Sequence, residues 1–268
     1  MLAGLGVQLT GWPEEFCAEL VDRGFYVVRY DNRDAGLSTV FDDGPRPDPM
    51  AVYLGDRSSV DYTLEDMADD AVGLLDALEI PAAHLVGSSM GAMIAQALAA
   101  RYPDRTLSLC SISATTGSTS VGQPTAEAFE LLARPPARSR EEFMEADIAS
   151  HRVLGSPAYP SDESNMRAEA GRAYDRAFVP DGTGRQLCAI IASGDRTASL
   201  AAITAPTVVI HGTEDKLIQP SGGEATAKAI VGAELVMIEG MGHDFPRGIW
   251  PQVIDAIVFN AARTDGRR

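Results

Sequence analysis

The chain has few of the residues that mark secreted, metal-binding or membrane proteins. Its 268 residues include only three cysteines, Cys17, Cys110 and Cys188, which are unclustered and have no metal-ligand spacing. An odd, unpatterned set of cysteines favours reduced thiols, and so predicts a cytoplasmic protein without a metal site. Residues 1–10 lack the basic region and long apolar stretch of a secretory signal. No run approaches the roughly 18 apolar residues of a membrane span, so we expect no membrane partner.

Basic residues are also scarce. Lysine and arginine number 22 against 38 acidic residues, which gives a formal net charge of −16. A surface this acidic repels phosphate backbones and argues against a nucleic-acid partner. Hydrophobic residues make up 45% of the chain, enough for the core of one large domain. Composition leaves the oligomeric state open, and a homo-oligomer remains possible.

Strands and helices alternate through most of the chain. Short apolar runs rich in β-branched residues predict strands at 25–30, 83–87, 106–113, 206–211 and 234–238. Amphipathic or alanine-rich stretches predict helices at 12–23, 63–78, 90–101 and 249–262. This alternation predicts an α/β fold with a mostly parallel sheet flanked by helices.

The alternation stops between residues 117 and 202. This stretch lacks strand-like runs and contains three predicted helices, at 126–133, 140–151 and 164–178, separated by loops rich in proline and glycine. We therefore expect residues 117–202 to be a helical cap inserted into an α/β core made of residues 1–116 and 203–268.

The clearest chemical motif is Gly87-Ser88-Ser89-Met90-Gly91. Only Ser89 has glycines at both required offsets, Gly87 and Gly91. In the G-x-S-x-G turn a serine lies in a strained backbone between a strand and a helix, and the two glycines let strand and helix approach. The motif predicts Ser89 as a nucleophile and the Met90 amide as an oxyanion donor. The alternative is a glycine-flanked turn without chemistry.

A serine hydroxyl needs a neighbouring base, and the chain offers four histidines. His243 lies in a glycine-containing loop after the last predicted strand, where ligand sites of open α/β sheets collect. It also completes the order serine, acid, histidine. His84, His151 and His211 are interpreted as structural residues. Glu214 and Asp215, after the preceding strand, are both candidates for the acid that orients the imidazole.

Several stretches together resemble the α/β-hydrolase superfamily, and within it the group that includes aclacinomycin methylesterase and many bacterial carboxylesterases. The matching segments are 4–13, 31–39, 62–68, 85–91, 211–215 and 240–243. The resemblance implies Asp215 as the orienting acid, with Glu214 as a solvated carboxylate. It also implies a second oxyanion donor at the Leu5 amide, in a segment that reads Ala3-Gly4-Leu5 instead of the common His-Gly-x. No cofactor or metal is implied.

The chain departs from this family at its beginning. Relatives normally have two antiparallel strands and most of a third before the oxyanion loop, whereas this chain begins almost at that loop. In the usual strand order the third strand lies between the strands predicted at 25–30 and 83–87. We therefore expect the N-terminal strands to be missing and the sheet to have a gap, with unpaired amides that each cost about 1–3 kcal/mol.

The expected function is hydrolysis of a small-molecule carboxylic ester through an acyl-enzyme on Ser89. A serine at this turn argues against the dehalogenases and epoxide hydrolases of the fold, which use aspartate there. The alternatives are a cofactor-free haloperoxidase or perhydrolase activity, C–C bond hydrolysis by the same three residues, and a non-catalytic ligand-binding protein. Candidate residues for the substrate pocket, any of which could instead pack the cap, are Phe129, Phe143, Met144, Tyr159, Met166, Tyr174 and Phe178.

Overall fold

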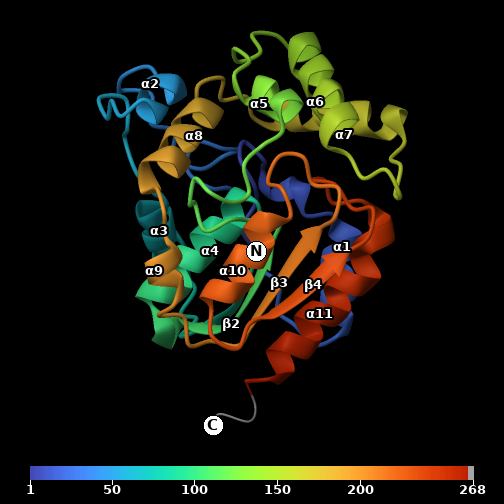
Figure 1. Ribbon diagram of the computed structural model, residues 1–268. Helices are drawn as coiled ribbons and strands as arrows, with labels where there is room; N and C mark the ends of the chain where they lie inside the picture. The colour runs from blue at the N-terminus through green and yellow to red at the C-terminus, as the bar shows by residue number, and fades with distance from the viewer. Residues whose placement is uncertain (265–268) are drawn as a thin grey trace.

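A computed structural model describes residues 1–264, which fold around one parallel sheet (Figure 1). The strands lie side by side in the order β1 (Ala83–Ser88), β2 (Thr106–Ile112), β3 (Thr207–Gly212) and β4 (Glu234–Ile238). Val86 lies opposite Cys110, and Cys110 lies opposite Val208. The four corresponding predicted strands are confirmed, with boundaries that differ by at most one residue.

The strand predicted at 25–30 is wrong. The segment of residues 25–30 forms neither a strand nor a helix. Only residues 1–3 lie between it and β1, and they supply one bond to it, from the Met1 ammonium to Val28 O at 2.6 Å. These three residues are too few to form a row of backbone hydrogen bonds with residues 25–30, so a strand does not form there.

The expected gap beside β1 is partly closed by these same residues. Leu2 N donates to Val86 O at 2.9 Å, and Ser88 N donates to Leu2 O at 3.2 Å, which forms a parallel bridge between Leu2 and Gly87. Leu2 packs into the core on one face of the sheet and Ala3 into the core on the other. Residues 2 and 3 therefore follow the alternation of a strand at the carboxyl end of β1, next to Ser89.

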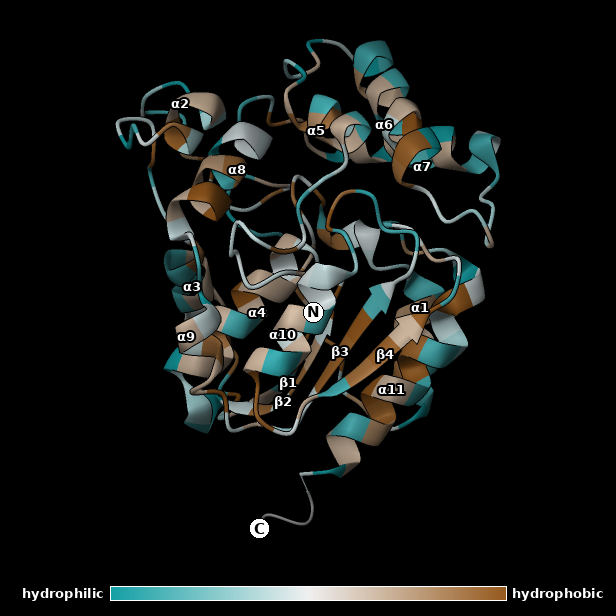
Figure 2. Ribbon diagram, viewed as in Figure 1, coloured by the Kyte–Doolittle hydropathy of each residue, from teal (hydrophilic) through white to brown (hydrophobic). Residues whose placement is uncertain are grey.

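Helices cover both faces of the sheet, as predicted (Figure 1). One face carries α1 (Glu14–Asp22) and α11 (Trp250–Ala262), and the other carries α3 (Leu64–Ala77), α4 (Met90–Arg101), α9 (Thr197–Leu200) and α10 (Ser221–Ala229). Apolar colouring concentrates on β3, β4 and α11 (Figure 2). A capping box begins α3, because the Thr63 hydroxyl accepts from Asp66 N and the Asp66 carboxylate accepts from Thr63 N.

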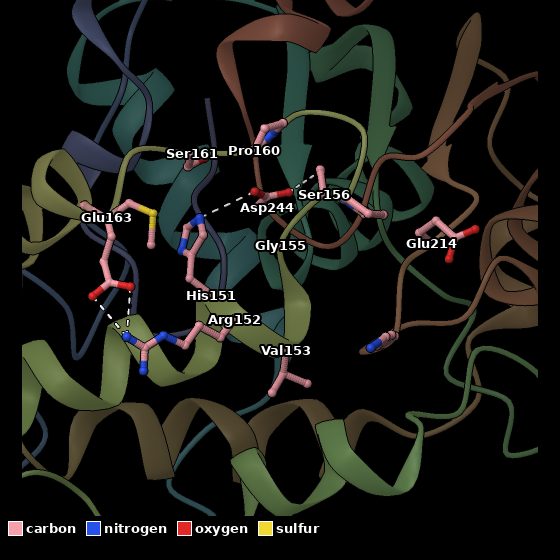
Figure 3. A pocket seen from close by; sticks show the side chains of 13 residues that line it. His151, Arg152, Val153, Gly155, Ser156, Pro160, Ser161, Glu163, Glu214 and Asp244 are labelled. Carbon is pink, nitrogen blue, oxygen red and sulfur yellow. Dashed lines mark hydrogen bonds and ion pairs between the residues drawn. The ribbon is translucent and has the colours of Figure 1, made fainter.

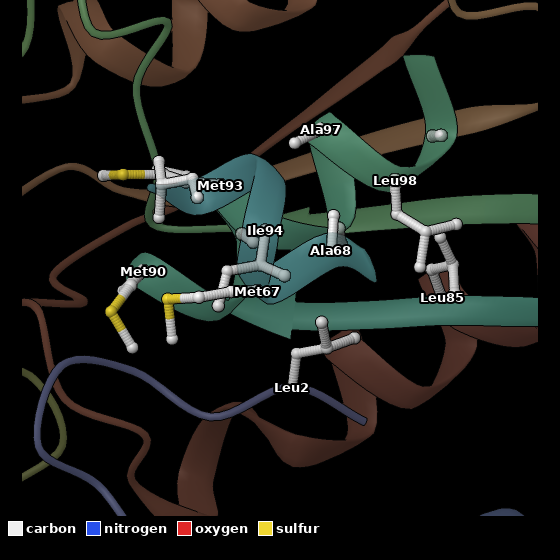
Figure 4. Close-up of a cluster of buried hydrophobic side chains, with 14 of the residues drawn as sticks. Leu2, Met67, Ala68, Leu85, Met90, Met93, Ile94, Ala97 and Leu98 are labelled. Carbon is white, nitrogen blue, oxygen red and sulfur yellow. The ribbon is translucent and has the colours of Figure 1, made fainter. Parts of the chain in front are cut away.

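Two buried clusters form the core, one on each face of the sheet. Neighbouring strand residues alternate between them, so that Leu85 and Leu109 face α3 and α4 while Val86 and Cys110 face α1 and α11. Figure 4 shows the first cluster, in which Leu2 lies beside the strand side chain of Leu85 and the α4 side chains. The cysteines at positions 17, 110 and 188 are all free and buried.

The helices between β2 and β3, here called the inserted helices, lie above the carboxyl ends of the strands (Figure 1). They are α5 (Ala126–Leu132), α6 (Arg140–Leu154), α7 (Glu163–Arg176) and α8 (Gly182–Ser193); the short α9, which also precedes β3, lies instead against the sheet. The first three confirm the predicted helices. The small helix α2 (Pro49–Tyr53) packs against α8, and single turns of 3-10 helix occur at Leu9–Gly11, Pro103–Arg105 and Arg247–Ile249.

Sequence patterns did not predict α8, because it begins directly after Pro180-Asp181 and contains two glycines in its first turn. Gly182 has a packing reason to be glycine: a Cβ there would lie 2.1 Å from Asp34 O. The helix thus comes close to the 31–38 turn. Across residues 1–264, no helix has both the length and the apolar character needed to cross a bilayer.

Candidate active site

Ser89 lies in the turn between β1 and α4 in a strained backbone conformation, with φ 54° and ψ −122°. Such positive φ values in a non-glycine residue persist only where the surroundings enforce them. Here a Cβ on Gly87 would lie 2.3 Å from Gly91 O, and a Cβ on Gly91 would lie 2.2 Å from Leu2 O. Both positions therefore require glycine, because strand, helix and N-terminal segment meet at this turn.

Three distant side chains form one chain of hydrogen bonds at the carboxyl ends of the strands. His243 Nε2 lies 3.0 Å from Ser89 Oγ, and His243 Nδ1 lies 2.7 Å from Asp215 Oδ2. Asp215 follows β3 and His243 follows β4. The His243 amide donates to Leu154 O at 2.7 Å, which fixes this loop against α6. In this geometry an imidazole can accept a proton from a hydroxyl while a carboxylate holds its other nitrogen.

The Asp215 carboxylate is fully buried yet well supplied with donors. Its Oδ1 accepts from the amides of Leu217 and Ile218 at 3.0 and 2.9 Å. Burial alone would raise the pKa of Asp215, but the charge of His243 and hydrogen bonds from His211 and His243 outweigh it and lower this pKa. The carboxylate therefore stays ionised and can stabilise an imidazolium.

The loop that contains Leu5 lies directly against Ser89. A Cβ on Gly4 would lie 3.4 Å from Ser89 Cβ, and Val7 N donates to Gly4 O at 3.1 Å, which closes a turn around Leu5. Met90 begins α4, whose first amides have no partner within the helix. The loop and the helix N-terminus thus bring the backbone at Leu5 and Met90 to the two sides of the serine.

The remaining histidines and Glu214 occupy other surroundings. His84 Nδ1 lies 2.8 Å from Ser108 Oγ, and Glu214 is exposed. His211 is buried, with Nε2 at 2.7 Å from Ile218 O and at 3.4 Å from Asp215 Oδ2. The contact of His211 with the carboxylate was not predicted. Its one signal in the sequence was the position of His211 four residues before Asp215, at the end of β3.

The candidate pocket residues are divided among several places. Phe143, Tyr174 and Phe178 pack against one another in tilted and edge-to-face contacts, with ring centroids 4.5–6.1 Å apart. Met144 is buried between α6 and α7, and Tyr159 packs against the core near Gly248. Phe129 is exposed on α5.

Met166 lines a cavity of about 340 Å³ beneath α6 and α7 (Figure 3). Its wall includes Glu214 and Asp244, the sequence neighbours of Asp215 and His243. Ser89 does not line this cavity. The cavity is therefore next to the residues that adjoin Asp215 and His243, and not at the serine.

One polar cluster in this wall was missed at the sequence level. His151 Nε2, on α6, lies 3.4 Å from Asp244 Oδ2, and the Ser156 hydroxyl donates to Asp244 and accepts from Gly242 N at 2.8 Å (Figure 3). The hydrogen bond to Asp244 raises the pKa of His151 against the opposing effect of burial, and the charges of Asp147 and Glu169 add to the rise. The cluster ties the His243 loop to α6.

We expect the stability contributed by the contact between His151 and Asp244 to depend on pH. A raised His151 pKa stabilises the fold below its unfolded value of about 6.5, and the contribution disappears as pH rises through the folded-state pKa. His151→Gln should therefore lower the free energy of unfolding by about 0.2–1 kcal/mol near pH 6 and have little effect near pH 9, measured by urea unfolding. Arg152→Gln, which breaks the neighbouring pair with Glu163, should cost the same at both pH values. If His151→Gln lowered the free energy of unfolding equally at pH 6 and pH 9, the expectation would be contradicted.

Comparison with known proteins identifies the family of this fold. Residues 2–246 match the family described as alpha/beta hydrolase fold. Rhodomycin D methylesterase DauP from Streptomyces sp. strain C5 is 29% identical over 96% of this chain and 88% of its own length.

Two solved structures are also similar. A hydrolase from Pseudomonas aeruginosa has a TM-score of 0.71 and 27% identity, with 97% of this chain and 88% of that chain covered. An enol-lactonase from Burkholderia xenovorans has a TM-score of 0.67 and 25% identity, with 98% and 88% covered. The sheet, the strained serine turn and these matches together show that this chain belongs to the α/β-hydrolase family.

Proposed function

We propose that this protein is a serine esterase that cleaves a small-molecule carboxylic ester through an acyl-enzyme on Ser89. The observation that carries the proposal is the unbroken hydrogen-bond chain from Ser89 Oγ through His243 to Asp215. The similarity to rhodomycin D methylesterase, at 29% identity over almost the whole chain, supports an ester as the substrate class.

In the proposed reaction His243 Nε2 takes the hydroxyl proton while Ser89 Oγ attacks the ester carbonyl. Asp215 holds Nδ1 and stabilises the imidazolium. The amides of Leu5 and Met90 donate to the tetrahedral oxyanion. The C–O bond to the alcohol then breaks and His243 returns its proton to the leaving oxygen. Water, deprotonated by His243, attacks the acyl-enzyme. The bond between Ser89 Oγ and the acyl carbon then breaks, which releases the acid, and His243 returns the proton to Ser89 Oγ.

We further propose that residues 117–202 act as a cap over this site. The inserted helices lie above the carboxyl ends of the strands, where Ser89 is half-buried. In this arrangement the aromatic cluster of Phe143, Tyr174 and Phe178 supplies apolar surface for the substrate.

A fluorophosphonate probe tests the proposal together with p-nitrophenyl esters that range from acetate to decanoate. We expect turnover of at least the shorter esters, covalent labelling of the wild-type protein, and mapping of the adduct to Ser89 rather than to Ser88. Absence of both turnover and labelling would contradict the proposal that the protein is a serine esterase, and would favour a non-catalytic ligand-binding protein.

The same preparation separates the rival reactions. A perhydrolase would halogenate a test dye when acetate, peroxide and bromide are supplied, and a C–C hydrolase would consume a vinylogous diketone. An esterase should turn over the p-nitrophenyl ester with a much higher kcat/KM than either of these substrates. A higher value for one of the other two would replace the proposed reaction.

A further inference from the structure

We propose that Gln186, on the inserted helix α8, is a positioning residue for the oxyanion donor at Leu5, an inference that rests on the proposed esterase reaction. Its side chain is fully buried and both ends of its amide are used. Oε1 accepts from Gly6 N at 2.8 Å, and Nε2 donates to Arg33 O at 2.7 Å. Gln186 is therefore a rigid connection between α8, the oxyanion loop and the 31–38 turn.

The bond from Gly6 acts on the centre of the turn that presents Leu5. Residues 4–7 form a four-residue turn, closed by Val7 N and Gly4 O, in which Gly6 has φ +69°. A positive φ at the third position is typical of a type II turn. The Leu5–Gly6 peptide is the unit that flips between turn types, and its N–H is the one that Gln186 holds. A flip would change ψ of Leu5 and φ of Gly6.

The carbonyl of the adjacent peptide fixes the direction of the Leu5 N–H itself. Gly4 O and Leu5 N belong to the same trans peptide, so they point in opposite directions. When Val7 N holds Gly4 O, the Leu5 N–H must point out of the turn. The Gln186 bond holds the next peptide of the same turn, so the peptides on both sides of Leu5 are fixed, one by Val7 N and the other by Gln186.

Two other hydrogen bonds anchor the ends of the loop, and a packing contact adds to the Gln186 bond at its centre. Asn32 Nδ2 donates to Ala3 O at 3.0 Å, and Leu9 N donates to Asp31 Oδ1 at 2.7 Å. The side chain of Thr183, on α8, packs so close to Gly6 that a Cβ there would lie 2.6 Å from its hydroxyl oxygen. Without Gln186 the half-buried Gly6 N–H would lose its partner, which favours a rearranged turn.

Gln186→Met keeps the length of the side chain and removes both hydrogen bonds. Removing one oxyanion donor typically costs about 10²–10³ in kcat, so displacing one should lower kcat by about 10- to 100-fold with KM little changed. Gln186→Glu keeps an acceptor for Gly6 N and should retain more activity than the methionine variant. The matched control is Gln96→Met, because Gln96 is also fully buried and hydrogen-bonded but lies on α4, bonded to Ser111. It should lower thermal stability without the loss in kcat.

Hydrogen–deuterium exchange of the peptide that contains residues 4–9 gives a readout that needs no turnover. We expect faster exchange in Gln186→Met than in wild type, and no change in Gln96→Met. Unchanged exchange in Gln186→Met would overturn the inference whether or not the protein cleaves esters. An equal fall in kcat in both methionine variants, measured well below their melting temperatures, would also overturn it. Absence of ester turnover in wild type would instead remove the proposed function.

Discussion

Ser89→Ala should lower kcat for ester cleavage by about 10⁶-fold, and His243→Ala should cost about as much, because nucleophile and base act as one unit. The two groups are 3.0 Å apart, so neither retains a role in proton transfer without the other. For the same reason the double variant should be no slower than either single variant. Initial rates with a p-nitrophenyl ester, together with fluorophosphonate labelling, measure the effect.

The control for this prediction is Ser88→Ala, which removes the neighbouring hydroxyl in the same turn. It should keep its labelling and most of its kcat. The assignment of Ser89 as nucleophile and His243 as base would be wrong if Ser89→Ala kept more than a small fraction of wild-type activity. It would also be wrong if the losses of the two single variants multiplied in the double variant. Asp215→Asn should cost less than either, about 10⁴-fold, because it only disturbs the imidazole tautomer.

Arg185→Met should lower the free energy of unfolding by about 3–5 kcal/mol, because it leaves a buried carboxylate without its counter-charge. Arg185, on α8, makes two hydrogen bonds to Asp34, at 3.0 and 2.8 Å, and both side chains are almost completely buried. Asp34 would keep only the Tyr62 hydroxyl at 2.6 Å and Phe41 N at 2.9 Å. Urea unfolding followed by circular dichroism measures the change.

A pair of matched variants separates burial from pairing. Arg140 makes the same two-bond contact with Asp175, at 2.8 and 2.9 Å, but both side chains are about half exposed, so Arg140→Met should cost less than about 1 kcal/mol. Adding Asp34→Asn to Arg185→Met should recover part of the lost stability, because it removes the unpaired charge. Equal costs for Arg185→Met and Arg140→Met would refute the argument.

The strands and the three site residues could be predicted because each depends on local pattern. Buried parallel strands are short, β-branched runs, and polar residues placed just after such strands meet at one edge of the sheet. Ser89, Asp215 and His243 each follow a different strand in this way. The segment at 25–30 has the same composition but is not a strand, since strand formation also needs a neighbour that composition does not reveal.

The contacts made by α8 could not be predicted for a different reason. Gly6 and Gln186 are 180 residues apart, and the helix that joins them begins with residues typical of a loop. These glycines serve close packing rather than flexibility, Gly182 against Asp34 and Gly184 against Pro47. The pairing of His151 with Asp244 was missed similarly, since each partner lies on a segment whose placement depends on the whole fold.

The burial of all three thiols has a practical consequence. Burial raises the pKa of each of the three thiols, which are in three different parts of the molecule. Cys17 is on α1, Cys110 in the central strand β2 and Cys188 on α8. An alkylating reagent at neutral pH can react with each only while that part is open. Mass spectrometry of the three peptides after brief alkylation would therefore give the order in which outer helix, sheet and inserted helix open, without any introduced label.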